Sequence, residues 1–403
     1  MTNSNRQVPI ATYRLQLSGH LSFEAVRQLV PYLSDLGVGA AYLSPFLRAR
    51  KGSTHGYDVI NHRQLEPTLG DEADFQRLAE TLAEREMGML VDVVPNHMNI
   101  DDPSNVWWQD VLENGPASVY AKYFDIDWNP PKGDLEGKVL LAVLGDQFGK
   151  VLEDQQLHLD YDDQRFVVRY FERRFPTDPR SWVAILKRAH HLVSQRLEPE
   201  REERMELESI ITALEHLPLR TDVAVASVQQ RYRESEVARR RLASLLEVCT
   251  EAREALQQAI SDFNGRTGDP TSYDKLEALL EEQSYRLCYW RVATDEINYR
   301  RFFDVDALAA IRVEDPEVFT AVHELVLRYV ERGWVTALRI DHADGLLDPQ
   351  QYLSNLVEAA GKVRPQITPA ITGRTAAPIY VVAEKILAAD ETLPCDWPIQ
   401  GTT

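Results

Sequence analysis

Two stretches of this 403-residue sequence place a carboxylate where it could take part in chemistry. In the first, Arg339 and Asp341 stand two positions apart in an apolar run, so on a β-strand both side chains point to the same face. A neighbouring guanidinium lowers the pKa of a carboxylate and fixes its rotamer, which suits a nucleophile that must stay ionised. In the second, Glu384 follows the apolar run 380–383, where desolvation is expected to raise the pKa of its carboxyl group, as a general acid requires.

One ionised and one protonated carboxyl group, about 5–5.5 Å apart, are what the retaining cleavage of a glycosidic bond requires. An Arg-x-Asp pair or a strand-end Glu by itself is more typical of a structural ion pair than of catalysis. The interpretation of Asp341 and Glu384 as catalytic groups rests on their occurrence, in order, at the ends of successive predicted strands.

Further polar residues follow the ends of the second, third and fourth predicted strands: His55, Tyr57, Asp58, Asp92, Asn96, His97, His342 and Asp344. Because the carboxyl ends of barrel strands converge on one pocket, side chains that are far apart in the sequence can meet there. Simpler roles exist for some of them, since Asp344-Gly345 is typical of a turn. We expect these residues to surround Asp341 and Glu384.

A metal centre is the alternative for the same part of the molecule. Histidine and aspartate ligate metals in other proteins, and the candidate ligands here are His55, His97, His342, Asp92 and Asp341. The sequence has neither H-x-H nor H-E-x-x-H spacing, however, and His97 follows Pro95-Asn96 in a predicted loop. We therefore predict that no metal is bound.

The elements that must position these residues alternate between strand and helix. Helices are predicted after Ser22 and Asp71 and over 316–332 and 349–361; strands are predicted over 11–17, 39–45, 88–94, 333–341 and 379–384. This alternation indicates parallel strands joined by crossover helices. The predicted fold class is therefore α/β, a (β/α)₈ TIM barrel that stops after about five strands.

Two segments interrupt the alternation. The first contains aromatic loops, with Trp107 and Trp108 among them, and is interpreted as an excursion after the third strand; lid and core roles suit these tryptophans equally. The second is helical, with opposite charges at i,i+4 spacing that are typical of solvated faces. The predicted domains are 1–97 with strands one to three, the excursion 98–181, the helical insertion 182–295, and 296–403 with strands four and five.

The composition excludes several classes of protein. The net charge of −19, from 63 acidic and 44 basic residues, argues against a nucleic-acid partner. Neither a run of 18 apolar residues nor an apolar segment near the N-terminus is present, so we predict no membrane span, no signal peptide and a cytoplasmic location. Cys249, Cys288 and Cys395 are scattered, and we expect buried, unpaired thiols.

Three of the strings resemble conserved regions of the α-amylase family of glycoside hydrolases: 92–97 (DVVPNH), 338–341 (LRID) and 382–384 (VAE). The resemblance implies that Asp341 is the nucleophile, that Glu384 is the acid/base and that Arg339 orients Asp341. It also implies that the sugar at subsite −1 stacks on Tyr57, with Asp58 supporting the same wall of the pocket and His97 binding the 6-hydroxyl.

A narrower resemblance is to the maltooligosyltrehalose synthases, one branch of that family. It runs from about Val8 to the last residue and rests on the strings 52–58 (GSTHGYD), 297–304 (INYRRFFD), 339–346 (RIDHADGL), 384–387 (EKIL) and 396–398 (DWP). Common amylases have Lys-His where this sequence has Asp344-Gly345. The long helical insertion is also similar to that branch.

The resemblance implies an isomerase of trehalose biosynthesis. Its reaction would convert the reducing-end α-1,4 bond of a maltooligosaccharide, or of a glycogen-derived glucan, into an α,α-1,1 bond by intramolecular transglucosylation, without a cofactor. Two alternatives stay open: a related α-glucan hydrolase or transglycosylase, and an inactive fragment that binds glucan.

The α-amylase family also uses a third catalytic aspartate, after a later barrel strand, for which the sequence offers no candidate. Loss of one transition-state partner costs orders of magnitude in rate, and an incomplete barrel leaves open strand edges. From the sequence we therefore expect a fragment that is inactive alone and that a second chain could complete by supplying the missing strands.

Overall fold

The computed structural model describes residues 8–363 and 379–403 and divides the chain into two compact units. The first unit comprises the described residues of Met1–Asp102 and Arg301–Thr403, and the second is Pro103–Arg300. The sequence predicts two separate segments within the second unit, divided at 181/182, whereas the structure gathers both into one compact body.

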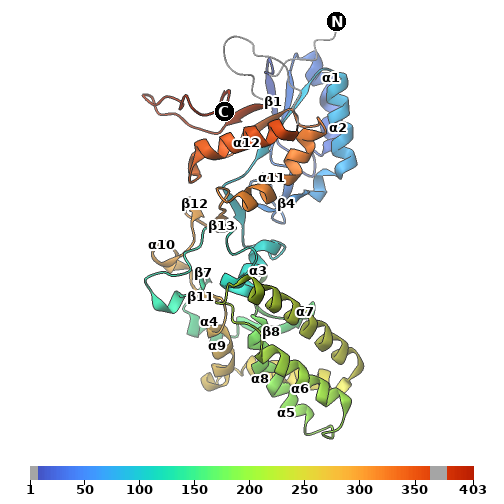
Figure 1. Ribbon diagram of the computed structural model, residues 1–403, viewed down its shortest axis with the longest axis vertical. Helices are drawn as coiled ribbons and strands as arrows, with labels where there is room; N and C mark the ends of the chain where they lie inside the picture. The colour runs from blue at the N-terminus through green and yellow to red at the C-terminus, as the bar shows by residue number, and fades with distance from the viewer. Residues whose placement is uncertain (1–7, 364–378) are drawn as a thin grey trace. The chain divides into compact units, whose positions relative to one another are not determined.

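A parallel sheet forms the centre of the first unit (Figure 1). In spatial order its strands are β1 (Thr12–Leu15), β2 (Ala40–Leu43), β5 (Gly88–Val93), β14 (Ala337–Ile340), β15 (Tyr380–Ala383) and β16 (Gly401–Thr402). Among the described residues the sheet thus has six strands, one more than the approximately five that the sequence predicts. The sixth strand has only two residues and no hydrophobic alternation, so no sequence pattern indicates it.

The crossover helices form where their apolar stripes and caps predict. They are α1 (Phe23–Asp35), α2 (Glu72–Glu84), α11 (Pro316–Glu331) and α12 (Pro349–Val363), with α1 against α2 and α11 against α12 (Figure 1). The Ser22 side chain accepts from the backbone N–H of Ala25, as an N-cap does. In α2 the stripe Phe75, Leu78, Ala79 and Leu82 is buried as predicted, whereas Leu29 of the α1 stripe is exposed.

The register of the sheet divides one of its faces into an apolar and a polar layer. Tyr42, Leu90, Ala337 and Val382 form a buried hydrophobic cluster across four neighbouring strands. Side chains two positions further along a strand point to the same face, so Asp92 and Arg339 lie above this cluster and are register partners. The sheet therefore places polar side chains near the carboxyl ends of its strands, next to a layer of apolar side chains.

The remaining strands of the first unit form short antiparallel pairs. β3 (Leu47–Ala49) pairs with β4 (Val59–Leu65), and β13 (Val305–Ala310) pairs with both β6 (His97–Asn99) and β12 (Arg301–Phe302). The N–H of Ile100 donates to the carbonyl of Ala307 at 2.9 Å, which extends the β6–β13 pairing to the point where the chain leaves for the second unit. The chain therefore leaves for residues 103–300 after β6 and returns on β12, the two outer strands of one three-stranded sheet.

The second unit combines helices with two small sheets. β7 (Val139–Leu144) pairs in parallel with β11 (Tyr285–Tyr289), and β8 (Leu157–Asp162), β9 (Arg165–Tyr170) and β10 (Arg173–Pro176) are antiparallel. Its helices are α3 (Val106–Asn114), α4 (Phe148–Glu153), α5 (Trp182–Val193), α6 (Glu202–Glu215), α7 (Val225–Val248), α8 (Thr250–Phe263), α9 (Asp274–Glu281) and α10 (Ala293–Glu296). The 3₁₀ helices of the chain are η1 (Pro67–Leu69), η2 (Gly115–Ala117), η3 (Gly133–Leu135), η4 (Pro179–Ser181), η5 (Pro270–Tyr273), η6 (Trp290–Val292) and η7 (Ala343–Gly345).

Two sequence predictions about single residues need correction. Trp107 and Trp108 lie on α3 rather than in loops, and both are buried against aromatic neighbours, so they are core residues and a lid role is wrong. Of the cysteines only Cys249 is buried; Cys288 is half-buried and Cys395 is exposed.

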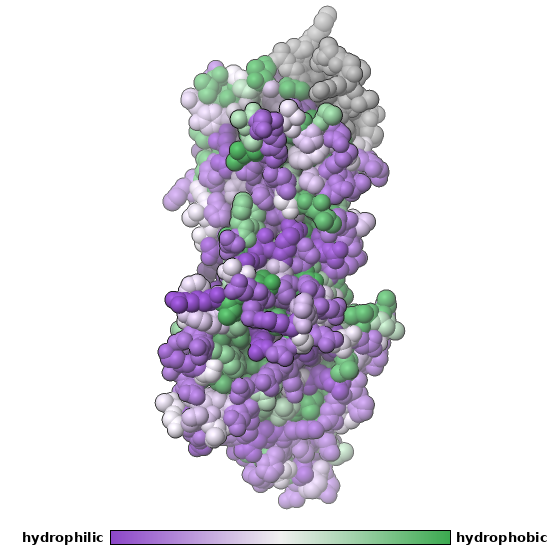
Figure 2. All heavy atoms as spheres, turned by 90° about the vertical axis from the view of Figure 1, so that its left-hand side faces the viewer, coloured by the Kyte–Doolittle hydropathy of each residue, from purple (hydrophilic) through white to green (hydrophobic). Residues whose placement is uncertain are grey.

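The surface in Figure 2 is mostly hydrophilic, with hydrophobic residues in small groups, as the charge of −19 leads one to expect.

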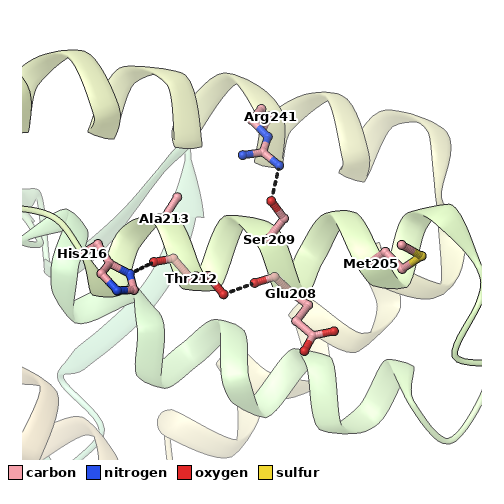
Figure 3. Close-up of a pocket in the computed structure, with 7 residues that line it drawn as sticks. All are labelled: Met205, Glu208, Ser209, Thr212, Ala213, His216 and Arg241. Carbon is pink, nitrogen blue, oxygen red and sulfur yellow. Dashed lines mark hydrogen bonds between the residues drawn. The ribbon is translucent and has the colours of Figure 1, made fainter.

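In the second unit a shallow groove lies between α6 and α7 (Figure 3). Its lining contains one carboxylate, Glu208, and one imidazole, His216, whose Nδ1 lies 2.7 Å from the carbonyl of Thr212. Over the described residues, no helix has both the length and the hydropathy needed to cross a bilayer.

The capping box of α2 gives a test of the fold. Asp71 accepts from the N–H of Asp74, whose side chain in turn accepts from the N–H of Asp71. We expect Asp71→Ala to lower the free energy of unfolding by about 0.5–2 kcal/mol, because the backbone N–H of Asp74 loses its acceptor. Denaturant titration of the full protein measures this. Glu84→Ala, which removes an exposed carboxylate from the last turn of the same helix, is the control; an equal loss in both variants would contradict the capping role.

Candidate active site

The guanidinium of Arg339 lies among three carboxylates at the ends of three neighbouring strands. Its Nη1 is 2.7 Å from Oδ1 of Asp92, on β5, and 2.6 Å from Oδ1 of Asp341, after β14. Its Nη2 is 3.1 Å from Oε2 of Glu384, which follows β15. The structure thus brings together the two candidate catalytic groups and the arginine that the sequence predicts to orient them.

Two tyrosines complete the surroundings of Asp92. The hydroxyls of Tyr42 and Tyr57 donate to its Oδ2 at 3.0 and 2.7 Å. The guanidinium of Arg14 donates in turn to the Tyr57 hydroxyl at 3.2 Å. Burial and the nearby Asp92 charge raise the pKa of Tyr57 to about 12, so its hydroxyl keeps its proton and remains a donor. Asp92, buried and bound on both oxygens, therefore fixes the positions of Arg339 and the Tyr57 ring.

The pKa of Asp341 differs from the sequence expectation. Its side chain is almost wholly buried, and this desolvation raises the pKa to about 7, although Arg339 counteracts the shift; the negative charges of Asp92 and Glu384 add to it. The sequence shows the adjacent guanidinium but not the burial or the two other carboxylates. The expected lowering of the Asp341 pKa is therefore not what the structure gives.

Glu384 shows the opposite shift. Burial by itself would raise its pKa, but the backbone N–H of His342, which donates to Oε2 at 2.9 Å, and the charge of Arg339 lower it. Its side chain is 36% exposed, far more than that of Asp341. Of the two carboxyl groups, Asp341 therefore has the higher pKa and holds a proton more tightly than Glu384.

The loop that carries Tyr57 is fixed by its own polar residues. Asp58 is buried and accepts from Nε of Arg50 at 3.2 Å and from the hydroxyl of Ser53. Nδ1 of His55 accepts from the backbone N–H of Tyr57 at 3.1 Å, and the two rings stack with centroids 6.0 Å apart. His55 and Asp58 therefore stabilise the conformation of the loop that contains Tyr57.

The segment after β5 packs against the same loop. Nε2 of His97 lies 3.2 Å from the carbonyl oxygen of Tyr57, and Nδ1 lies 3.5 Å from Nδ2 of Asn96, so the proton on Nε2 satisfies both contacts. The His97 ring also lies 4.2 Å, centroid to centroid, from the ring of Phe302. Asn96 and His97 are both buried at this position.

His342 adopts a backbone conformation that non-glycine residues rarely use, with φ +46° and ψ +48°. This turn aims its N–H at Glu384 and folds its ring back over Gly345. A Cβ atom at position 345 would lie 2.2 Å from Cδ2 of the His342 ring, so only glycine fits there without displacing the imidazole. The geometry of residues 342–345 thus supports one of the hydrogen bonds that position Glu384.

The metal alternative has no support in this geometry. Within residues 8–363 and 379–403, no three His, Cys, Asp or Glu side chains are grouped as metal ligands. The place between Asp92, Asp341 and Glu384, where a cation would balance their charge, is taken by the guanidinium of Arg339. The histidines proposed as ligands contact backbone groups and aromatic rings instead.

Sequence reasoning missed several residues of the site. Tyr42 and Arg14 contact the Asp92–Tyr57 pair, and the ammonium of Lys385 lies 3.5 Å from Oδ2 of Asp344. A signal for Tyr42 exists, since a tyrosine inside an apolar strand needs a partner for its hydroxyl. For Arg14 and Lys385 the sequence shows only a charge next to a strand end, which is common on protein surfaces.

Comparison with known proteins places this site in a family. The family model for the catalytic domain of alpha amylase matches residues 18–177. An intracellular maltogenic amylase of Bacillus subtilis is 38% identical over 103 residues, which cover 26% of this chain and 17% of that protein. The parallel sheet fits a partial TIM barrel, and residues 18–177, which reach into the second unit, are similar to the catalytic domain of alpha amylase.

A more particular similarity covers almost the whole chain. A protein of Mycobacterium tuberculosis provisionally named maltooligosyl trehalose synthase is 31% identical over 400 residues, which are 98% of this chain and 37% of that protein. The structure of maltooligosyltrehalose synthase from Arthrobacter ramosus matches with a TM-score of 0.65 and 31% identity, over 98% of this chain and 37% of that one. The chain is therefore a relative of the maltooligosyltrehalose synthases and spans somewhat over a third of their length.

The contact between His342 and residue 345 leads to a first test. We expect Gly345→Ala to lower the free energy of unfolding by about 1–3 kcal/mol, because the new methyl group overlaps the imidazole. Gly149→Ala is the matched control, since a Cβ there meets nothing within 4 Å and alanine favours the helix α4. Denaturant titration of both variants of the full protein measures their free energies of unfolding. A Gly345→Ala variant that is as stable as the unsubstituted protein would contradict the close packing.

The buried carboxyl of Asp341 leads to a second test. Its folded-state pKa of about 7 lies above the ordinary value of 3.8, so the folded protein binds the proton more tightly and loses stability as the pH rises from about 4 to about 7. Asp341→Asn removes this loss. We expect the stability of the variant relative to the unsubstituted protein to increase by roughly 1–3 kcal/mol between pH 5 and pH 8.

Thermal or denaturant unfolding at several pH values measures that difference. Asp35→Asn, at the exposed end of α1, is the control and should leave the pH dependence as it is. An Asp341→Asn variant whose relative stability stays constant between pH 5 and pH 8 would show that Asp341 is already ionised at pH 5.

Proposed function

We propose that the protein is a maltooligosyltrehalose synthase, a (1→4)-α-D-glucan 1-α-D-glucosylmutase that serves trehalose formation. The observation that carries the proposal is the pairing of Asp341 and Glu384 through Arg339 at neighbouring strand ends. It is supported by the similarity to such synthases over 98% of the chain. The substrate is the reducing end of a maltooligosaccharide or of a glycogen-derived α-1,4-glucan.

The first step breaks the last α-1,4 bond. Glu384 gives its proton to the glycosidic oxygen while an oxygen of Asp341 attacks the adjoining anomeric carbon, which is the division of roles in a retaining glycosidase. The bond between that carbon and the glycosidic oxygen breaks, so the reducing-end glucose leaves with a new hydroxyl. The rest of the glucan is then an ester of Asp341, and Glu384 is a carboxylate.

The second step forms the new bond from the same atoms. The freed glucose turns until its anomeric hydroxyl faces the ester, Glu384 takes the proton of that hydroxyl, and its oxygen attacks the anomeric carbon. The ester bond breaks and Asp341 returns to a carboxylate. Two inversions at one carbon give an α,α-1,1 linkage, and substrate and product are isomers, so the reaction consumes neither water nor a cofactor.

The pKa values of the pair bear on how Glu384 obtains its proton. In the free site burial raises the pKa of Asp341 to about 7, whereas the pKa of the partly exposed Glu384 is lowered. A sugar placed against Glu384 removes water from it, and desolvation favours the protonated form of a carboxyl group. We infer that substrate binding moves the proton from Asp341 to Glu384, which leaves Asp341 ionised as the attacking group.

The remaining residues of the site are proposed to bind or present the substrate. Tyr57 offers its ring to the sugar whose anomeric carbon reacts, and His97 its imidazole to the 6-hydroxyl of that sugar. Arg339 orients Asp341 and Glu384, and Asp92 holds Arg339 and Tyr57 in place. The substrate-binding set is completed by residues that hold the surrounding loops: His55, Asp58, Asn96 and His342.

Product analysis tests the proposed function. The full protein is incubated with maltopentaose, and reducing ends and anomeric NMR signals are followed. When a second chain supplies the missing barrel strands, we expect reducing ends to disappear and an α,α-1,1 product of unchanged size to form, whereas the 403-residue chain alone is expected to be inactive. Asp341→Asn and Glu384→Gln should each lower the rate by about 10³-fold or more, since each removes a group needed in the transition state.

Glu208→Gln, in the groove between α6 and α7, is the matched control and should keep the full rate. New reducing ends in place of the isomer would indicate a hydrolase. Binding of maltopentaose without any product would indicate a glucan-binding protein, and both outcomes would contradict the proposed function.

A further inference from the structure

Arg14 connects the edge strand β1 to the candidate active site. It is the register partner of Tyr42 on β2, and its guanidinium carbon lies 5.6 Å from the centroid of the Tyr42 ring. Its Nη2 donates to the hydroxyl of Tyr57 at 3.2 Å, across 43 positions of the sequence. Although Arg14 is exposed, its guanidinium is therefore held by two tyrosines.

Arg14 adds a fourth contact to the three that hold the polar groups of Tyr57. The backbone N–H of Tyr57 donates to Nδ1 of His55 at 3.1 Å, and its carbonyl oxygen lies 3.2 Å from Nε2 of His97. Its hydroxyl donates to Oδ2 of Asp92 at 2.7 Å, which leaves the lone pairs of the hydroxyl oxygen for another donor. Arg14 is that donor. Because a guanidinium cannot accept a hydrogen bond, it keeps the phenolic proton directed at Asp92.

The orientation of the Tyr57 ring depends on what holds its hydroxyl. A tyrosine ring can turn about χ1 and χ2, and the preference at χ2 is broad, so contacts at the far end of the side chain are needed to fix the ring. Two side chains from different strands supply them, Asp92 from β5 and Arg14 from β1. The ring centroid lies 5.8 Å from the guanidinium carbon of Arg339. A single hydrogen bond would permit rotation about itself, whereas two from different directions define one orientation.

The residue two positions after Arg14 binds the loop that contains Tyr57. Side chains two positions apart on an extended chain point to the same face. Nε2 of Gln16 donates to the backbone carbonyl of His55 at 3.3 Å. The β1 segment therefore contacts this loop at two points, at its backbone through Gln16 and at the end of the Tyr57 side chain through Arg14.

We propose that Arg14 is a positioning residue, which holds the Tyr57 ring in the orientation in which the ring stacks on the reacting sugar. This inference rests on the proposed function, which assigns that sugar to Tyr57. Arg14 acts through the Tyr57 hydroxyl and not through a contact of its own with the glucan. Its charge matters because a hydrogen bond from a charged donor is stronger than one from a neutral donor such as water.

Maltopentaose binding to the full protein provides the first arm of the test. Isothermal titration calorimetry gives the dissociation constant for the unsubstituted protein and for Arg14→Met, in which the guanidinium is lost. We expect the constant to rise about three- to tenfold, because the sugar must then order the ring itself. Arg48→Met is the matched control and should leave the constant unchanged, since Arg48 lies on β3 of the same unit and donates to Oε1 of Gln64 at 2.8 Å. Equal constants for the unsubstituted protein and Arg14→Met, or no binding by the unsubstituted protein, would overturn the inference.

A double-mutant cycle with Tyr57→Phe separates positioning from direct contact with the glucan. Tyr57→Phe keeps the aromatic ring and removes the hydroxyl to which Arg14 donates. If Arg14 acts through that hydroxyl, Arg14→Met should change the dissociation constant by less than about twofold in the Tyr57→Phe background. The full effect of Arg14→Met in that background would show that Arg14 contacts the glucan itself, and the positioning role would be wrong.

NMR of the full protein with tyrosine labelled by ¹³C at Cζ provides the second arm, which needs no ligand. The Tyr57 resonance is identified by its loss in Tyr57→Phe, and its chemical shift reports the hydrogen bonds of the hydroxyl. Arg14→Met should move this resonance and Arg48→Met should not; an unmoved resonance in Arg14→Met would overturn the inference. Neither arm depends on turnover. If no α,α-1,1 product forms even when a second chain supplies the missing strands, the proposed function fails, and the binding constants and the ¹³C shift still decide the role of Arg14.

Discussion

The candidate site depends on one buried cation, the guanidinium of Arg339. It binds carboxylates from three neighbouring strand ends, so it compensates charges that could not otherwise share so small and dry a space. The register of the sheet is tied to this compensation, because Arg339 lies directly opposite Asp92 on β5 and Val382 on β15. A shift of one residue would turn the guanidinium to the other face of the sheet and leave the carboxylates without a counter-charge.

One cation cannot neutralise three anions, and this imbalance explains the titration behaviour of the site. Burial raises the pKa of Asp92, although Arg339 and the hydrogen bonds from two tyrosines counteract the shift. Asp341 is more buried than Glu384, and its pKa is raised whereas that of Glu384 is lowered.

The sequence predicts the scaffold well where periodicity and caps are strong. The strands of the apolar runs, the helices after Ser22 and Asp71 and the meeting of Asp341 with Glu384 all follow from local patterns, since parallel strands bring their ends together whatever lies between them. The predictions failed where the deciding quantity was not local. Burial reversed the expected pKa order, and the two-residue strand Gly401–Thr402 carries no hydrophobic signal of its own.

The aromatic residues show the same limit from another side. Trp107 and Trp108 are of a residue type that is also found in lids, but both are buried on helix α3. Phe303, in contrast, is exposed at a turn with positive φ, where phenylalanine is unusual. The sequence gives the residue type, but only the structure shows which aromatic ring is exposed to solvent. The role of Lys385 likewise depends on a partner, Asp344, that stands 41 positions earlier in the chain.

The pairing of β6 with β13 has a consequence for the history of such proteins. The chain leaves the first unit after β6 and returns on β12, and both strands belong to one three-stranded sheet with β13 between them, so this sheet fixes both ends of the 103–300 segment. The entropy of closing a loop grows only slowly with its length when its ends are fixed. Insertions and deletions within this segment therefore add little entropic cost to the folding of the first unit, which carries the carboxylates at its strand ends.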